Sequence, residues 1–473
     1  MSPLEEVSSP ERAVSPPDNA LDYLDESFFL DFRAEGHGPV IQFTWIYEHD
    51  VDIDALRRFH RNLGKSLMGR RIERSPIPFC RARWVAWPGP EDIDIAGDVR
   101  ARADVTSWTY EQAARPIDPE AGPSWRMAVQ PLSGGGAAVT LLAAHAVIDG
   151  VGMLIAVADA VNGAIRDLGY PAPRSRTKMQ AWLRDSRAVL RDLPRVAQAL
   201  VTVPFAARSL QDHVRPRAGR TAAFARSGSK QSTLARRDPA VNRMITIPSV
   251  MIYVDIDHWD ERAQALGGTS NSLFLGLASR LCDAVRWVDE DGMANFTIPV
   301  NQREPGDTRG NALTGLQLTL DPSPSVASDL RGVRAALKAA LSTLGETRTK
   351  LEAPLPLIPF VPAFASHRFQ AVLLNSANLT CSNVGDIDPA VNRPDGTDAQ
   401  HFSVRFMRMA GQLTGSHVSE AGGLFFPVAT GRIAGEVFIS ISYVDRDGST
   451  TAEGLTDIIG SVLNEFGVTA SVE

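Results

Sequence analysis

The chain has 473 residues, 44% hydrophobic and 22% charged, with a formal net charge of −7. This length favours two globular lobes over a single core, and the acidic balance argues against a nucleic-acid-binding protein, which usually carries a basic surface. Cys80, Cys282 and Cys381 are far apart and show no Cys-x-x-Cys spacing, so neither a disulfide framework nor a zinc site is predicted.

The N-terminal segment, residues 1–19, is rich in Ser, Pro and Glu and has no apolar stretch of the kind found in signal peptides. We therefore expect a disordered leader there. No run approaches the roughly 18 consecutive apolar residues that a membrane-spanning helix needs. Together these features predict a cytoplasmic protein.

Structured patterning begins after the leader. Val40–Tyr47 is β-branched and aromatic and predicts a strand, and Asp52 is a candidate N-cap for a helix that extends to Leu67. Two apolar runs, 124–132 and 137–143, flank Ser133 and three glycines, which predicts a β-hairpin because glycine permits the positive φ of a tight reversal. A phosphate-binding role for these glycines is disfavoured, since a strand and not a Lys-Ser/Thr helix follows.

The second half mixes strands and helices without a fixed repeat. This order favours α/β lobes with mixed sheets over one doubly wound sheet. The predicted strands are 244–256, 296–300, 313–320, 378–384, 402–407 and 436–444, and the predicted helices are 273–288, 326–344 and 452–466.

We divide the chain into an N-terminal lobe (20–170), a basic connector (171–243) and a C-terminal lobe (244–473). The connector holds many more Lys and Arg than Asp, and apolar residues between Met179 and Leu200 recur at helical spacing. One interpretation is a solvated helical crossover. The other is a surface for an anionic partner: coenzyme A phosphates, an acyl carrier protein, or an anionic membrane that the protein contacts peripherally.

The segment Val139–Gly150 carries the strongest functional signal. An apolar run that predicts a buried strand leads to His145, and Asp149 and Gly150 follow as a turn before an apolar helix at Val151–Val161. A histidine at the mouth of a strand suits a general base, because its pKa lies near the working pH. The spacing suggests that Asp149 shapes the turn and takes no part in proton transfer. The alternative for His145 is a core histidine without a chemical role.

This segment, Ala144-His145-Ala146-Val147-Ile148-Asp149-Gly150, resembles the His-His-x-x-x-Asp-Gly signature of the condensation-fold, or chloramphenicol acetyltransferase-like, acyltransferases. That superfamily includes nonribosomal peptide condensation domains, polyketide-associated acyltransferases and wax ester synthase/diacylglycerol acyltransferases. Other segments are similar to the wax-synthase-like branch in the same order: Leu21–Asp25, Arg115–Asp118 with Pro123–Met127, Ile298–Arg303 with Gly310-Asn311, Thr380–Val384, and Phe425–Val428.

The resemblance implies two lobes with a tunnel between them, in which a thioester donor and an acceptor meet at the signature histidine. His145 aligns with the second histidine, the family's general base. Asp149 aligns with the structural aspartate that commonly pairs with an arginine of the second lobe, for which Arg303 is the best candidate. Gly150 matches the glycine that lets the chain leave the turn into the helix.

Two positions depart from the family pattern. Ala144 replaces the first histidine, which makes altered or lost catalysis more plausible without removing the base. Asn271-Ser272 stands where Asn-Asp is often found.

Further candidates for the site come from the late strand. Ser382 and Asn383 are candidate oxyanion donors, and His417 is a candidate for lining the tunnel, although a surface loop is the simpler interpretation of His417. No Gly-x-Ser-x-Gly motif is present, and Cys381 has no histidine near it in sequence, so a covalent acyl-enzyme is not predicted. No histidine shows ligand spacing, and neither a metal nor a cofactor is expected.

The sequence thus predicts an acyltransferase that moves an acyl group from acyl-CoA or an acyl carrier protein to a hydroxyl or amine of a small-molecule acceptor. Two alternatives stay open: a non-catalytic protein that binds acyl-type ligands, and a condensation-fold protein that catalyses another reaction such as a cyclisation.

Overall fold

The computed structural model describes residues 19–166, 168–214, 247–362, 379–408, 424–425, 427–445 and 447–473. The elements before the connector are α1 (Tyr23–Glu35), β1 (Pro39–Tyr47), α2 (Ile53–Leu63), β2 (Arg70–Glu73), β3 (Arg83–Ala86), β4 (Asp94–Ile95), η1 (Arg102–Asp104), α3 (Val105–Ala113), β5 (Trp125–Pro131), β6 (Ala137–Ala144) and α4 (Gly150–Val161). The connector holds α5 (Lys178–Val214). The elements after it are β7 (Ser249–Asp255), α7 (Ile256–Ala265), α8 (Ser270–Ala284), β8 (Ala294–Asn301), β9 (Leu313–Leu320), η3 (Pro324–Ala327), α9 (Arg331–Ser342), α10 (Leu344–Glu352), η4 (Leu355–Phe360), β10 (Leu379–Asp386), η5 (Pro389–Asn392), β11 (His401–Arg408), β12 (Leu424–Phe425), β13 (Val428–Ile433), β14 (Glu436–Val444), α13 (Ala452–Glu465) and β15 (Ser471–Val472).

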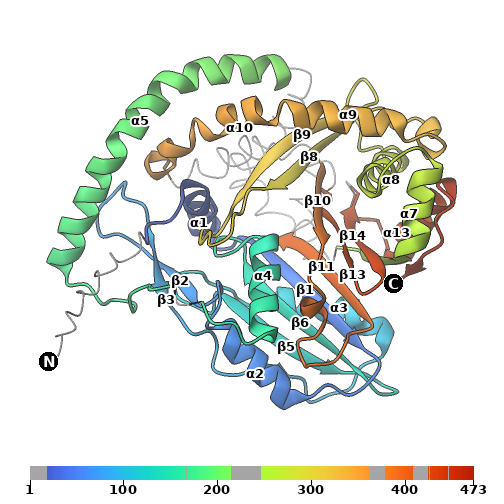
Figure 1. The fold of residues 1–473 in the computed structure, drawn as a ribbon, viewed down its shortest axis with the longest axis horizontal. Coiled ribbons are helices and arrows are strands. Elements are labelled where there is room, and N and C mark those ends of the chain that lie inside the picture. Colours follow the sequence, from blue (N-terminus) through green and yellow to red (C-terminus); the bar gives the residue numbers. More distant parts are fainter. Residues whose placement is uncertain are drawn as a thin grey trace, which may run out of the picture.

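The first sheet has the strand order β11-β1-β6-β5-β4 within the described residues. The predicted hairpin of β5 and β6 is confirmed, with Pro131 opposite Ala137 and the three glycines at positive φ in the turn. β6 is buried along its whole length, and α2 and α4 lie against each other in this lobe (Figure 1). The strand that leads to His145 is therefore held on both edges and both faces.

The predicted helix after β1 is confirmed but shorter than expected. The Asp52 side chain accepts a hydrogen bond from the Ala55 backbone N–H at 2.9 Å, as an N-cap does. The helix ends at Leu63, before the predicted Leu67, where Gly64 passes so close to Pro88 that a Cβ on Gly64 would lie 1.9 Å from the Pro88 carbonyl oxygen. The tertiary contact ends the helix, and hydrophobic spacing alone does not reveal it.

The second sheet follows the order β15-β7-β14-β13-β10-β8-β9, and β12 pairs with β14. Both sheets are mixed, since β4 runs parallel to β5 and β10 runs parallel to both β8 and β13. The mixed α/β class predicted from the sequence is confirmed. The tunnel between the lobes stays a prediction.

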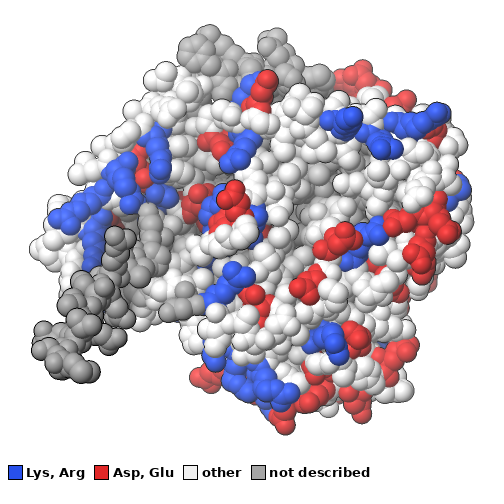
Figure 2. All heavy atoms as spheres, viewed as in Figure 1, with Lys and Arg blue, Asp and Glu red and all other residues white. Residues whose placement is uncertain are grey.

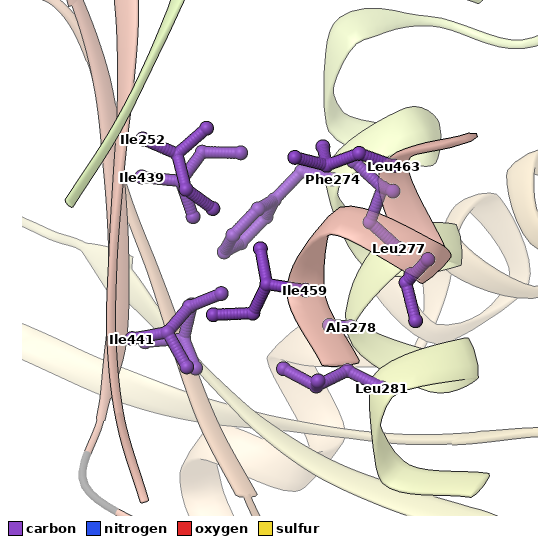
Figure 3. Close-up of a pocket in the computed structure, with 11 residues that line it drawn as sticks. Ile252, Phe274, Leu277, Ala278, Leu281, Ile439, Ile441, Ile459 and Leu463 are labelled. Carbon is purple, nitrogen blue, oxygen red and sulfur yellow. The ribbon is translucent and has the colours of Figure 1, made fainter. Parts of the chain in front are cut away.

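A small apolar cavity of ≈ 20 Å³ lies in the core of the second lobe, between α8, α13 and the sheet (Figure 3). Its walls are entirely aliphatic or aromatic, so the cavity offers no polar partner to a ligand. We interpret it as a packing defect. The lining residues are Ile252, Phe274, Leu277, Ala278, Leu281, Val428, Ile439, Ile441, Ile459, Val462 and Leu463.

One strand of the second half completes the first sheet. β11 pairs antiparallel with β1 from Pro39↔Arg408 to Ile46↔His401, and it also contacts β13 and β14. Ser440 of β14 donates to the Val404 carbonyl oxygen at 2.7 Å. The place of β11 in the first sheet differs from the assignment of all of 244–473 to the C-terminal lobe. Strand pairing follows proximity in space and not order along the chain.

The helix predicted in the connector is present as α5, which runs along one edge of the molecule (Figure 1). The single helix predicted over 326–344 is instead a 3₁₀ turn, η3, followed by α9 and then α10. None of the helices within the described ranges combines the length and the apolar character needed to cross a bilayer.

Candidate functional site

His145 lies in the turn that follows β6 directly, at the centre of contacts from several elements. Its backbone N–H donates to the Pro39 carbonyl oxygen at 2.9 Å, and its own carbonyl oxygen accepts from Asn311 Nδ2 at 2.9 Å. The imidazole stacks on Phe28 of α1, with ring centroids 4.7 Å apart and planes within 9°. Phe406 of β11 lies 6.0 Å away on centroids. Two segments thus hold the backbone of His145, and two others place aromatic rings beside its imidazole.

The environment of His145 favours the neutral imidazole. Burial lowers the pKa of His145, and the residue's own backbone, the charge of Asp149 and the Asn311 side chain oppose this only in part. Nδ1 is buried without a hydrogen bond of good geometry, while His145 as a whole residue is only partly buried. A neutral imidazole near pH 7 is able to accept a proton.

Asp149 shapes the turn after His145 and caps α4. Its Oδ1 accepts from the Gly152 N–H at 2.6 Å, and its Oδ2 accepts from the Ala312 N–H at 2.7 Å and from Arg303 Nη2 at 2.8 Å. A carboxylate at a helix N-terminus is favoured by the helix dipole and by the unsatisfied N–H groups there. With its oxygens occupied in this way, Asp149 has a structural role.

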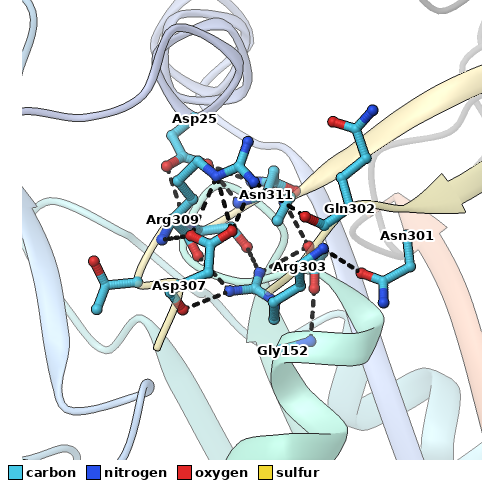
Figure 4. A network of polar contacts seen from close by, with 12 residues as sticks. Asp25, Gly152, Asn301, Gln302, Arg303, Asp307, Arg309 and Asn311 are labelled. Carbon is cyan, nitrogen blue, oxygen red and sulfur yellow. Dashed lines mark hydrogen bonds and ion pairs between the residues drawn. The ribbon is translucent and has the colours of Figure 1, made fainter. Parts of the chain in front are cut away.

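Arg303 reaches this turn from the loop after β8. Besides its ion pair with Asp149, it donates from Nη2 to the Gly310 carbonyl oxygen at 3.0 Å and from Nη1 to the Arg309 carbonyl oxygen at 2.9 Å. The side chains of Arg303 and Asp149 are only 2% and 4% exposed. Figure 4 shows Arg303 lying over the first turn of α4 beside Gly152. The pair is therefore a buried brace between the two halves of the chain.

Asp25 and Asn311 form a second brace that sequence reasoning did not identify. Asp25, fully buried in α1, accepts from the backbone N–H groups of Gly310 at 2.9 Å and Asn311 at 2.6 Å, and from Asn311 Nδ2 at 2.9 Å. The same Nδ2 group also donates to the His145 carbonyl oxygen. Burial raises the pKa of Asp25 to about 7. Both residues lie in segments that resemble the family, but nothing in their spacing indicates a contact.

Arg70 holds the other side of the same turn. Its Nη2 donates to the Val147 carbonyl oxygen at 3.0 Å, and its Nη1 donates to the Thr308 carbonyl oxygen. The guanidinium lies over the Trp84 ring, 4.0 Å from its centroid. Arg70 therefore ties the turn after His145 to the same loop that carries Arg303.

The structure gives packing reasons for the small residues of the motif. Gly150 has no positive φ, but a Cβ there would lie 3.1 Å from Phe406 Cζ, so close approach and not an unusual turn favours glycine. Ala144, at the position of the missing histidine, is the buried last residue of β6 and packs in a cluster with Val40 and Met407.

The candidates of the late strand lie in β10. Asn383 Nδ2 donates to Asn271 Oδ1 at 2.8 Å, and Asn383 Oδ1 accepts from the Gly385 N–H at 2.8 Å, so this side chain is largely engaged within the protein. Ser382 is partly buried. His417 lies outside the described residues. The proposed oxyanion roles of Ser382 and Asn383 stay predictions.

Metal ligands do not gather anywhere in the part of the chain that the structure describes: there is no group of three or more His, Cys, Asp or Glu side chains placed to hold an ion. Among the described residues, the site brings together His145, the aromatic rings beside it and two buried braces. What this arrangement offers chemically is a neutral imidazole at His145.

Gly152 offers a test of how tightly the brace is packed. A Cβ at Gly152 would lie 3.0 Å from Arg303 Nη2, Asp149 Oδ1 and Ile148 Cγ1. We expect Gly152→Ala to destabilise the fold by about 1–3 kcal/mol through overpacking. The matched control is Gly460→Ala in α13, where the added methyl meets nothing within 4 Å and should stabilise by about 0.5–1 kcal/mol. Urea denaturation of both variants measures the difference, and equal effects would contradict the tight packing.

No protein-family model matches the chain, and no curated protein matches it in sequence. Solved structures do match over nearly the whole length. The first condensation domain of the calcium-dependent antibiotic synthetase, in complex with a substrate analogue, is 14% identical, with 95% of this chain and 96% of that one covered and a TM-score of 0.55. The wax ester synthase/diacylglycerol acyltransferase from Marinobacter aquaeolei VT8 is 12% identical, with 94% and 98% covered and a TM-score of 0.51.

At this level of identity the similarity concerns the fold alone. A condensation domain and a wax ester synthase match with nearly equal scores, so the wax-synthase-like branch stays a prediction. Three observations establish the fold: the two mixed sheets, the pairing of β11 with the first sheet, and a match that covers nearly the whole of this chain and of the solved structures. The chain has the two-lobed, mixed α/β condensation fold that these solved structures share.

Proposed function

We propose that this protein is an acyltransferase that moves an acyl group from a thioester, either acyl-CoA or an acyl carrier protein, to a hydroxyl or amine acceptor. His145 acts as the general base, and no cofactor is required. The observation that carries the proposal is the environment of His145: a partly buried residue whose imidazole has a lowered pKa and is held by aromatic rings and backbone contacts. The names of the solved structures with this fold, a condensation domain and an acyltransferase, agree with this class of reaction.

The reaction runs in two steps on one bound pair of substrates. His145 Nε2 takes the proton of the acceptor hydroxyl or amine as the acceptor atom bonds to the thioester carbonyl carbon, which gives a tetrahedral oxyanion. The carbon–sulfur bond then breaks, the carbonyl re-forms, and the imidazolium returns its proton to the thiolate. Nε2 takes this role because Nδ1 is the buried nitrogen.

The braces position the base and do not touch the substrates. Asp149 and Arg303 fix the turn that follows His145, and Asp25 holds Asn311 against the His145 carbonyl oxygen. Orientation of this kind lowers the barrier because the base need not be ordered during the reaction. Asp25 and Asn311 are therefore positioning residues.

Direct transfer is favoured over a covalent acyl-enzyme. Cys381 is fully buried, and burial raises its pKa well above the ordinary value, so the nucleophilic thiolate is disfavoured. Ser382, the neighbouring hydroxyl on β10, is a candidate donor to the oxyanion.

The alternative function is ligand binding without transfer, or another reaction such as a cyclisation on the same fold. Ala144 is the observation that favours it, since this chain lacks the first signature histidine. In a cyclisation that does not consume a thioester, His145 shuttles a proton and no thiol leaves.

Free-thiol release from a panel of acyl-CoAs, with and without alcohol and amine acceptors, tests the proposal. Acyl transfer predicts thiol release that depends on acyl length and one equivalent of acylated acceptor by mass spectrometry. Carrier-loaded donors are tested in the same way. Thermal stabilisation by acyl-type ligands with no thiol released from any donor would favour the non-catalytic alternative.

A further inference from the structure

A second pocket lies away from His145, between α5, the N-terminal end of α1, β3 and η4. Its volume is ≈ 390 Å³, a size typical of small-molecule sites. Tyr23 of α1 lines it, whereas Phe28 of the same helix stacks on His145. The pocket is therefore distinct from the candidate active site, although α1 borders both.

The lining is strongly cationic in a chain that is acidic overall. It contains six arginines and two aspartates. Both aspartates are already in ion pairs, Arg81–Asp192 at 2.8 Å and Arg176–Asp185 at 2.5 Å, and the four side chains are at most 14% exposed. The first pair joins α5 to the segment before β3, and the second joins α5 to the residues directly before it in the connector.

Other arginines of the lining face solvent from α5. Arg184 and Arg187 are exposed, and within the described residues no ion pair holds either of them. Figure 2 shows Lys and Arg atoms gathered over α5. A cationic rim above a pocket concentrates anions, and guanidinium groups bind phosphate in a bidentate manner.

An aromatic pair lies at the same pocket. Phe79 and Phe360 stack with ring centroids 5.5 Å apart and planes within 10°, and they stay 59% and 39% exposed. The Phe79 backbone has φ +64°, in the left-handed region that bulky residues rarely adopt. Residues with strained backbone angles are concentrated at ligand sites. An exposed ring held in this way offers a face on which a ligand ring can stack.

We propose that this pocket binds a soluble organic phosphate that carries a flat ring, such as a nucleotide. The rim arginines Arg184 and Arg187 bind the phosphates, and the ring stacks on the Phe79–Phe360 pair. This site goes beyond the proposed acyl transfer, and its occupancy is measurable without turnover. Its failure and the failure of the catalytic proposal are therefore distinguishable.

Calorimetric titration of the full chain with inorganic pyrophosphate and with ADP tests the site. We expect both to bind, with ADP several-fold tighter because of stacking. Arg184→Ala/Arg187→Ala should weaken both ligands by about tenfold or more, since charge-assisted hydrogen bonds are lost. Phe79→Gly, which the positive φ tolerates, should reduce the affinity for ADP to that for pyrophosphate.

The matched control removes two exposed arginines elsewhere, Arg58 of α2 and Arg334 of α9, neither of which lines the pocket. Arg58→Ala/Arg334→Ala should bind both ligands as the wild type does. Failure of both ligands to bind the wild type would overturn the proposal. A control variant whose affinities fall as much as those of Arg184→Ala/Arg187→Ala would overturn it as well. An ADP affinity that Phe79→Gly leaves unchanged would overturn the stacking role of the aromatic pair.

Discussion

Arg303→Met should destabilise the protein by about 3–5 kcal/mol, because removing one partner of a buried ion pair leaves the other charge without compensation. Asp149 is 4% exposed and would stay in place after the substitution, together with three backbone carbonyl groups that accept hydrogen bonds from Arg303. Methionine keeps much of the side-chain length, so the loss of stability comes mainly from the missing charge and hydrogen bonds. The free energy of unfolding in urea measures it.

The control for this prediction is Arg331→Met. Arg331 pairs with Asp329 at 2.7 Å, but the two side chains are 79% and 42% exposed. A solvated pair of this kind contributes about 0–1 kcal/mol. If both substitutions change stability equally, Arg303 is not the brace that its contacts indicate.

His145→Gln should reduce the acyl-transfer rate by about 100- to 10,000-fold, the usual contribution of a positioned general base. Glutamine is polar and of similar length but takes up no proton near neutral pH. The fold should remain stable, because the His145 side chain makes stacking contacts and its backbone bonds are kept. Initial rates of thiol release in the presence of acceptor, beside the thermal midpoint of each protein, give the comparison.

The control here is His49→Gln, a surface histidine whose Nε2 contacts Thr397 at 2.8 Å. Its rate should match that of the wild type. A His145→Gln variant that turns over at the normal rate would eliminate His145 as the base.

The part of the site that sequence predicts best is the local part. A strand, a histidine, an Asp-Gly turn and a helix occur within Val139–Val161, and each of these elements leaves a pattern in consecutive residues. Arg303 is distant in sequence, and only the family resemblance indicates its link to Asp149. The contact at 2.8 Å gives that link its physical basis.

The part that sequence does not predict depends on distant contacts. Asp25 and Gly310 are 285 positions apart, and an acidic residue in the first turn of a helix ordinarily serves as a favourable charge near the helix N-terminus. Its burial against the loop after β8 is set by the packing of both halves. β11 is similar, because a strand's own residues do not specify which sheet it joins.

The pH dependence of kcat/KM is the measurement that tests the role of His145 most directly. The lowered pKa of His145 means that the base is protonated, and the rate falls, only as the pH drops below about 6.5, the ordinary histidine value. We expect a plateau through neutral pH, a fall on the acid side below that value, and no such fall in His145→Gln. A rate that falls already near pH 7 would instead follow Asp25, whose pKa burial raises to about 7. An acid limb that persists in His145→Gln would contradict His145 as the general base.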